Sequence, residues 1–72
     1  MRVYEDSRGW RFAVRHGIGG DCFKVQYQKP EHRGGAVGWH GVRALPWRAT
    51  EEEAQSDLDR YAVRRGMKEV LT

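Results

Sequence analysis

The 72-residue chain is predicted to be a single α+β domain, residues 1–72, in which one C-terminal helix packs on a three-stranded antiparallel sheet. Two observations predict this fold. Segments in the first two thirds of the chain alternate apolar and polar residues, which is the period of a half-buried strand. A stretch near the end carries a helical pattern with a start signal and a stop signal. A chain of this length has room for one sheet and one helix around one core.

The first two strands are expected at about 10–16 and 22–28, joined by the glycine-rich hairpin segment 16–21. Every second residue in them is large and apolar, so one face of the sheet should be buried. The side chains expected on that face, under the helix, are Trp10, Phe12, Val14, Phe23, Val25 and Tyr27.

The third strand is expected at about 37–45, after a loop marked by Pro30 and paired glycines. Its alternation is poorer, because Trp39 and Leu45 suit one face while Val42 suits the other, and a bulge near Gly41 would reconcile them. Two alternatives remain at each end of the chain. Residues 3–4 form either a short edge strand or a frayed start, and residues 70–71 either close the core or add an edge strand.

The helix is expected at about 51–65. Thr50 is the N-cap, and Glu53 three residues later completes a capping box. Gly66 is placed for a left-handed C-cap. The residues that share one apolar face of this helix are Ala54, Leu58, Tyr61 and Ala62.

Positive charge is concentrated in the predicted sheet. Residues 1–50 hold nine Lys or Arg against four Asp or Glu, a net charge of +5, whereas residues 51–72 hold four bases against six acids, a net charge of −2. Seven of the nine bases are arginine, whose planar fork suits phosphate and carboxylate groups. This asymmetry favours a polyanionic partner, either nucleic acid or an acidic protein.

The sheet face away from the helix is the expected nucleic-acid-binding surface. Cations on such a grid neutralise phosphates, and Arg or Gln side chains reach base edges. An exposed antiparallel face is polar in any protein, so its polarity alone does not decide the matter. The residues expected to bind nucleic acid are Arg11, Arg15, Lys24, Gln26, Gln28 and Arg43, with His40 replacing Arg43 in the other register of the third strand.

Three short motifs resemble the AP2-like domains of plant transcription factors and the arm-type DNA-binding domains of phage integrases. The segment 10–15, the Thr-Glu-Glu-Glu-Ala run at 50–54 and the pair 61–62 are similar to the first strand, the helix start and the helix end of those domains. The resemblance implies three strands and one helix, with DNA bound by the sheet. The chain departs from the family at Arg48, where an aromatic residue is usual, and in its long 29–38 loop. The chain is short, rich in tryptophan and expected to end in one helix, and in these features it also resembles small proteins of phages and mobile elements.

A protein-interaction module, such as a phage-type inhibitor or adaptor, is the alternative. It would act through the 29–41 loop and the edge of the third strand, with Arg33, Trp39 and His40 as contact residues. The chain would then be a monomer or an edge-paired homodimer.

No enzymatic activity and no cofactor are expected. The three histidines and Cys22 lack the paired spacing of a zinc site, and the glycines at 17–20 precede a strand rather than a helix, unlike a phosphate loop. The single cysteine, the lack of an apolar leader and the lack of a long apolar run predict a cytoplasmic protein that does not enter membranes.

Overall fold

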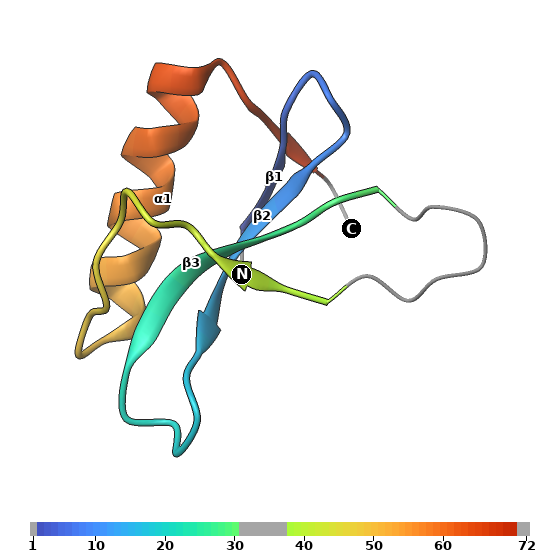
Figure 1. Cartoon of the computed structure of the whole chain (residues 1–72). Helices are drawn as coiled ribbons and strands as arrows, with labels where there is room; N and C mark the ends of the chain where they lie inside the picture. The colour runs from blue at the N-terminus through green and yellow to red at the C-terminus, as the bar shows by residue number, and fades with distance from the viewer. Residues whose placement is uncertain (1, 31–37, 71–72) are drawn as a thin grey trace.

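In the part of the chain that the structure describes, the sheet has five strands, and one helix lies across one of its faces (Figure 1). The computed structural model describes residues 2–30 and 38–70. The elements are β1 (Val3–Glu5), β2 (Arg11–His16), β3 (Phe23–Gln28), β4 (His40–Gly41), α1 (Glu51–Arg65) and β5 (Lys68–Val70). The strand order is β4-β3-β2-β1-β5, and every neighbouring pair is antiparallel. The predicted α+β class with a C-terminal helix is confirmed, whereas the count of three strands is wrong.

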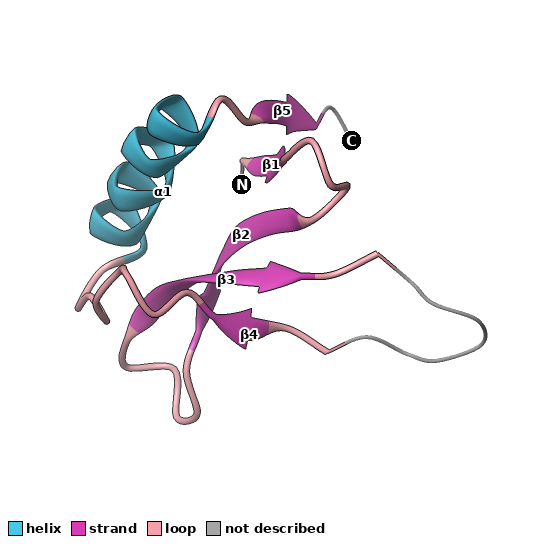
Figure 2. Cartoon of the chain, turned by 45° about the horizontal axis from the view of Figure 1, so that its top comes forward, coloured by secondary structure: helices cyan, strands magenta, loops and turns pink. Residues whose placement is uncertain are grey.

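The two additional strands lie at the two ends of the described chain. Figure 2 shows β5 beside β1, and their register places Val3 opposite Val70. β1 also pairs with β2 through Tyr4 and Phe12. Each of these outer strands is three residues long, which is too short for an alternating pattern to stand out in the sequence.

The third predicted strand is much shorter than 37–45. Among the described residues of that span, only His40 and Gly41 form a strand. The chain then turns, with the Leu45 N–H donating to the Val42 carbonyl at 3.2 Å. Val42 and Leu45 are both buried, at 7% and 8% exposure, because the turn directs both of them into the core. A turn after β4, and not a bulge at Gly41, therefore explains the broken alternation.

The core lies between the sheet and α1. Phe12, Val14 and Val25 come from β2 and β3, and Ala54 and Leu58 come from the helix. Leu58 has no exposed surface, and the aromatic residues expected on this face pack around the same cluster. The expected orientation of the sheet is confirmed, since its apolar face is the one that the helix covers.

The helix begins and ends where the sequence predicts. The Glu53 N–H donates to the Thr50 hydroxyl at 3.2 Å, and that hydroxyl donates to the Glu53 carboxylate at 3.1 Å. Gly66 adopts a φ of 66°, and the Met67 N–H donates to the Ala62 carbonyl at 2.9 Å. Within the described part of the chain, no helix is both long and apolar enough to cross a membrane.

One acidic residue of the helix is buried, which the apolar stripe did not indicate. Asp57 accepts hydrogen bonds from Arg48 at 2.8 and 3.1 Å and from Arg60 at 3.1 Å. Arg48 is itself paired with Phe23 of β3 by two backbone hydrogen bonds of 2.7 Å. The hydrogen bonds from Arg48 lower the pKa of the Asp57 carboxyl, against the opposing effect of burial. This ion pair fastens the segment before the helix to the helix.

Candidate nucleic-acid interface

The face of the sheet opposite α1 carries most of the predicted binding residues. We call it the open face, and it comprises Arg11, Arg15, Lys24, Gln26 and Gln28 together with the side chains that border them. The register of β2 and β3 places Arg15 opposite Lys24 and Arg11 opposite Gln28. Since Phe12, Val14 and Val25 alternate with these residues and point into the core, the polar set lies on the other side. Figure 1 shows α1 on only one side of the sheet.

Trp39 borders the open face beside β4. Gly41 is paired with Gln26, so continuation of that ladder brings Trp39 level with Gln28. The guanidinium carbon of Arg15 lies 4.9 Å from the centre of a Trp39 ring. Trp39 is half-buried, which is consistent with an indole lying along the sheet surface. A cation over an indole at this distance is an attractive contact.

Trp47 borders the open face at the other end. Its neighbour Arg48 points toward the helix, so the extended backbone directs Trp47 to the opposite side. The Lys24 ammonium lies 5.5 Å from the centre of a Trp47 ring. The indole packs on Gly17, where an added Cβ would come within 2.8 Å of a Trp47 ring carbon. Trp47 remains 50% exposed, so much of this indole stays available to a partner.

The charge of the open face is positive but not uniform. Arg11 forms an exposed ion pair with Glu5 at 3.3 Å, and Lys68 of β5 lies opposite Glu5 in the register. Arg15 and Lys24 have no acidic partner among the described residues and contact indoles instead. Their charges are therefore the most available for an anionic ligand. The sequence did not indicate that Lys68 lies beside this face, because it left undecided whether the end of the chain forms a strand.

Two of the predicted contact residues, Arg43 and His40, are not on the open face. Arg43 follows β4 in the turn and lines a groove with Tyr27 and Tyr61, on the helix side of the sheet. Its expected place among the nucleic-acid-binding residues of the open face is therefore wrong, because β4 ends before it. His40 pairs with Tyr27, and their rings lie 5.7 Å apart on that same side. Arg33 lies outside the described residues.

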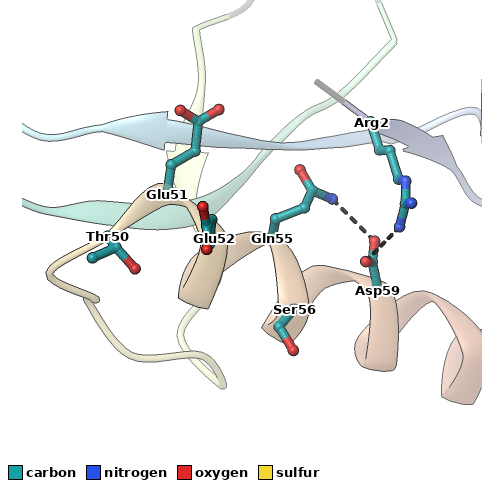
Figure 3. A pocket seen from close by; sticks show the side chains of 7 residues that line it. All are labelled: Arg2, Thr50, Glu51, Glu52, Gln55, Ser56 and Asp59. Atoms are coloured by element: carbon teal, nitrogen blue, oxygen red, sulfur yellow. Dashed lines mark hydrogen bonds and ion pairs between the residues drawn. The ribbon is translucent and has the colours of Figure 1, made fainter.

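A hollow with several acidic side chains lies along the first turns of α1 (Figure 3). Asp59 accepts three hydrogen bonds there: from Arg2 at 2.7 Å, from the Tyr4 hydroxyl at 2.8 Å and from Gln55 at 3.0 Å. Burial raises the pKa of Tyr4, and its hydrogen bond to Asp59 does so further. These contacts join the N-terminal strand to the helix, so the carboxylate has a structural role here.

Among the residues that the structure describes, metal-binding and nucleophilic side chains are not gathered into a site. In residues 2–30 and 38–70, no group of three or more His, Cys, Asp or Glu side chains is placed to hold a metal ion. His16 Nδ1 lies 3.2 Å from the Gly17 carbonyl, and no hydrogen bond joins it to Cys22 within this part of the chain. His32 lies outside the described residues.

The open face therefore brings together two cations from β2 and β3 and two indoles from the segments that precede β4 and α1. Comparison of the chain with protein-family models, with curated proteins and with solved structures finds no match.

Proposed function

We propose that this chain is a small, non-enzymatic module that binds nucleic acid, with DNA as the expected form, through the open face of its sheet. The observation that carries the proposal is the pairing of cations with indoles, Arg15 with Trp39 and Lys24 with Trp47. Nucleic acids present phosphates that need neutralisation and bases that stack on flat rings, and this face offers both. The resemblance to AP2-like and integrase arm-type domains points to the same face.

The residues of the open face take different parts in this proposal. Arg15 and Lys24 neutralise phosphates, and the amides of Gln26 and Gln28 reach base edges. Arg11 joins them when a phosphate displaces Glu5, because an exposed ion pair of this kind contributes little stability. Trp47 offers its exposed indole surface to an unpaired base.

A titration of fluorescein-labelled 20-mer DNA, single-stranded and duplex, at several salt concentrations tests the proposal. Three to four phosphate contacts predict that log K falls with log salt concentration with a slope of about −3. Absence of binding at about 50 mM salt would refute the proposal, because that is the condition in which phosphate contacts are strongest. Comparison of the two DNA forms shows whether stacking on the tryptophans favours the single strand.

A matched pair of variants separates the open face from net charge. The double substitution Arg15→Gln and Lys24→Gln removes two positive charges from the open face. The control, Arg64→Glu, lowers the net charge by the same two units at an exposed position of α1. We expect the first pair to flatten the salt slope by about 2 and the control to leave it nearly unchanged. Equal losses in both would show that the protein attracts DNA through overall charge only.

The alternative is a module that binds an acidic protein or a second copy of itself at a sheet edge. In the described part of the chain, the outer sides of β4 and β5 have no strand neighbour, which favours this second candidate. These edges are only two and three residues long, and such short edges give a partner strand few hydrogen bonds. Sedimentation over a hundredfold range of concentration tests the homodimer, and a constant monomer mass would exclude it.

A further inference from the structure

A second basic site lies on the helix side of the sheet. A groove of about 360 Å³ is bounded there by β2, β3, the turn after β4 and the C-terminal part of α1. We call it the arginine groove. Trp10, Tyr27 and Tyr61 form aromatic walls, and three arginines from separate segments line it: Arg8, Arg43 and Arg65. It shares no residue with the polar set of the open face.

Arg8 is held in place by two contacts. Asp6 accepts from its Nε at 3.0 Å and from its Nη2 at 2.7 Å, and its guanidinium carbon lies 3.6 Å from the centre of a Trp10 ring. Trp10 in turn stacks on Tyr27, with ring centres 5.3 Å apart. Burial raises the pKa of Asp6, but hydrogen bonds from Arg8 and from the Trp10 amide outweigh it and lower that pKa overall, so Asp6 stays ionised. The Arg8 side chain is 56% exposed, and its Nη1 has no hydrogen-bond partner among the described residues, so it can donate to a ligand.

The other two arginines are less constrained. Arg65 donates to the Tyr61 hydroxyl at 3.0 Å, which keeps its head group beside the groove wall. Arg43 is exposed, and it has no ion pair or hydrogen-bond partner among the described residues. Three arginines and one aspartate leave the groove with a net charge of +2. The Lys29 ammonium, 5.2 Å from a Trp10 ring, adds to the positive field nearby.

We propose that the arginine groove binds a phosphate monoester. A monoester carries a charge of about −1.5 to −2 at pH 7 and three acceptor oxygens, which matches the groove better than a carboxylate or a phosphodiester with a single charge. Arginine forks are the side chains best suited to several such oxygens at once. A volume of about 360 Å³ holds the phosphate and one attached ring or sugar. The Trp10 ring is already packed between Arg8 and Tyr27, so it serves as a wall.

This site does not depend on the nucleic-acid proposal. The probes are three small anions that share one ring: phenyl phosphate, its methyl diester and benzoate. Binding is followed through the indole N–H resonance of Trp10, assigned with Trp10→Phe. We expect phenyl phosphate to bind at least tenfold more tightly than the diester or benzoate. Equal affinities for the three anions, or no shift at about 10 mM of any of them, would overturn the proposal, since that concentration exceeds weak Kd values of about 1 mM.

Arg43 provides the sharpest variant, because it is exposed and its loss should leave the fold intact. Arg43→Gln should weaken phenyl phosphate binding about tenfold or more, the value of one charge-assisted hydrogen bond. Arg64→Gln is the control. Arg64 is an exposed arginine in the last turn of α1, next to Arg65, but it does not line the groove. Equal effects of the two variants would refute the assignment to the groove.

The phosphate has two possible sources, a small metabolite or the 5′ end of a nucleic-acid strand. Oligonucleotides with a 5′-phosphate and with a 5′-hydroxyl distinguish them. If the strand end is the ligand, the 5′-phosphate tightens binding, and Arg43→Gln removes that gain without changing the affinity for the 5′-hydroxyl strand. If a small monoester is the ligand, phenyl phosphate binds while the two oligonucleotides bind alike.

Discussion

Replacement of Asp57 by asparagine should destabilise the fold substantially, although the change keeps the size of the side chain. The Asp57 side chain is 4% exposed and accepts two hydrogen bonds from Arg48 and one from Arg60. The asparagine amide can still accept from Arg48, but it loses the charge and one acceptor oxygen. Arg48 is 36% exposed and regains some hydration, so we expect a loss smaller than the roughly 3–5 kcal/mol of a fully buried charge pair.

The expected loss in free energy of unfolding is about 2 kcal/mol, the value of hydrogen bonds to a charged group in this setting. In a domain of this size, that loss lowers the thermal midpoint by about 8–16 °C. Circular dichroism melts at pH 7 measure it, with Asp21→Asn as the matched control. Asp21 is exposed and has no ion-pair partner among the described residues. A midpoint that drops by no more than that of the control would refute the role assigned to the pair.

The same pair predicts how stability depends on pH. Asp57 and Asp6 both have folded-state pKa values below the ordinary 3.8. For such groups, the unfolded chain binds protons first, so their stabilisation is present above the ordinary pKa and is lost as pH falls through the lower folded value. The difference between wild type and Asp57→Asn should therefore be full at pH 7 and should shrink below about pH 4. A difference that stays constant down to pH 2 would contradict this origin.

Three further substitutions have defined outcomes. Gly17→Ala places a methyl group 2.8 Å from a Trp47 ring carbon, so it should displace that indole, cost about 1–3 kcal/mol and change the tryptophan fluorescence. An unchanged spectrum would show that Trp47 does not rest on Gly17. Leu58→Ala opens a cavity at a position with no exposed surface and should cost about 2–5 kcal/mol, enough to populate the unfolded state at 37 °C. Thr50→Ala removes the acceptor of the Glu53 N–H and should cost about 1 kcal/mol, whereas Thr50→Ser should restore most of it. Equal midpoints for alanine and serine would exclude the cap as the cause.

The helix and the two central strands could be predicted because each carries a strong local signal. The N-cap, the C-cap and the stripe of Ala54, Leu58 and Ala62 depend on spacing alone, which the sequence shows directly. The alternation of β2 and β3 likewise identified the buried face and, by elimination, Arg15 and Lys24 on the other. What could not be predicted depends on contacts between residues distant in sequence, as in the pairing of β1 with β5. It also depends on a turn that places Val42 and Leu45, which would face opposite sides of a regular strand, in the same core.

The two proposed binding surfaces were likewise predictable only in part. Strand periodicity predicted which polar residues lie on the open face. The positions of Trp39 and Trp47 could not be predicted, because they depend on the register of β4 and on the β-bridge between Arg48 and Phe23. The arginine groove was not foreseen, because its arginines lie 22 or more positions apart and none repeats with a recognisable spacing. Only the packing of the turn at 6–9 and the end of α1 against β3 and the turn after β4 brings them to one hollow.

The pairing of β5 with β1 has a consequence for how the chain folds during synthesis. Figure 2 shows the two strands side by side, and Val70 lies opposite Val3. The β2–β3 hairpin can form as soon as its residues leave the ribosome, but β1 keeps a bare edge until residue 70 has been made. Pairing across almost the whole chain length slows folding, since the intervening loop must be closed first. β5 can therefore pair with β1 only after the residues between them have been made, and until then the nascent chain exposes an open strand edge.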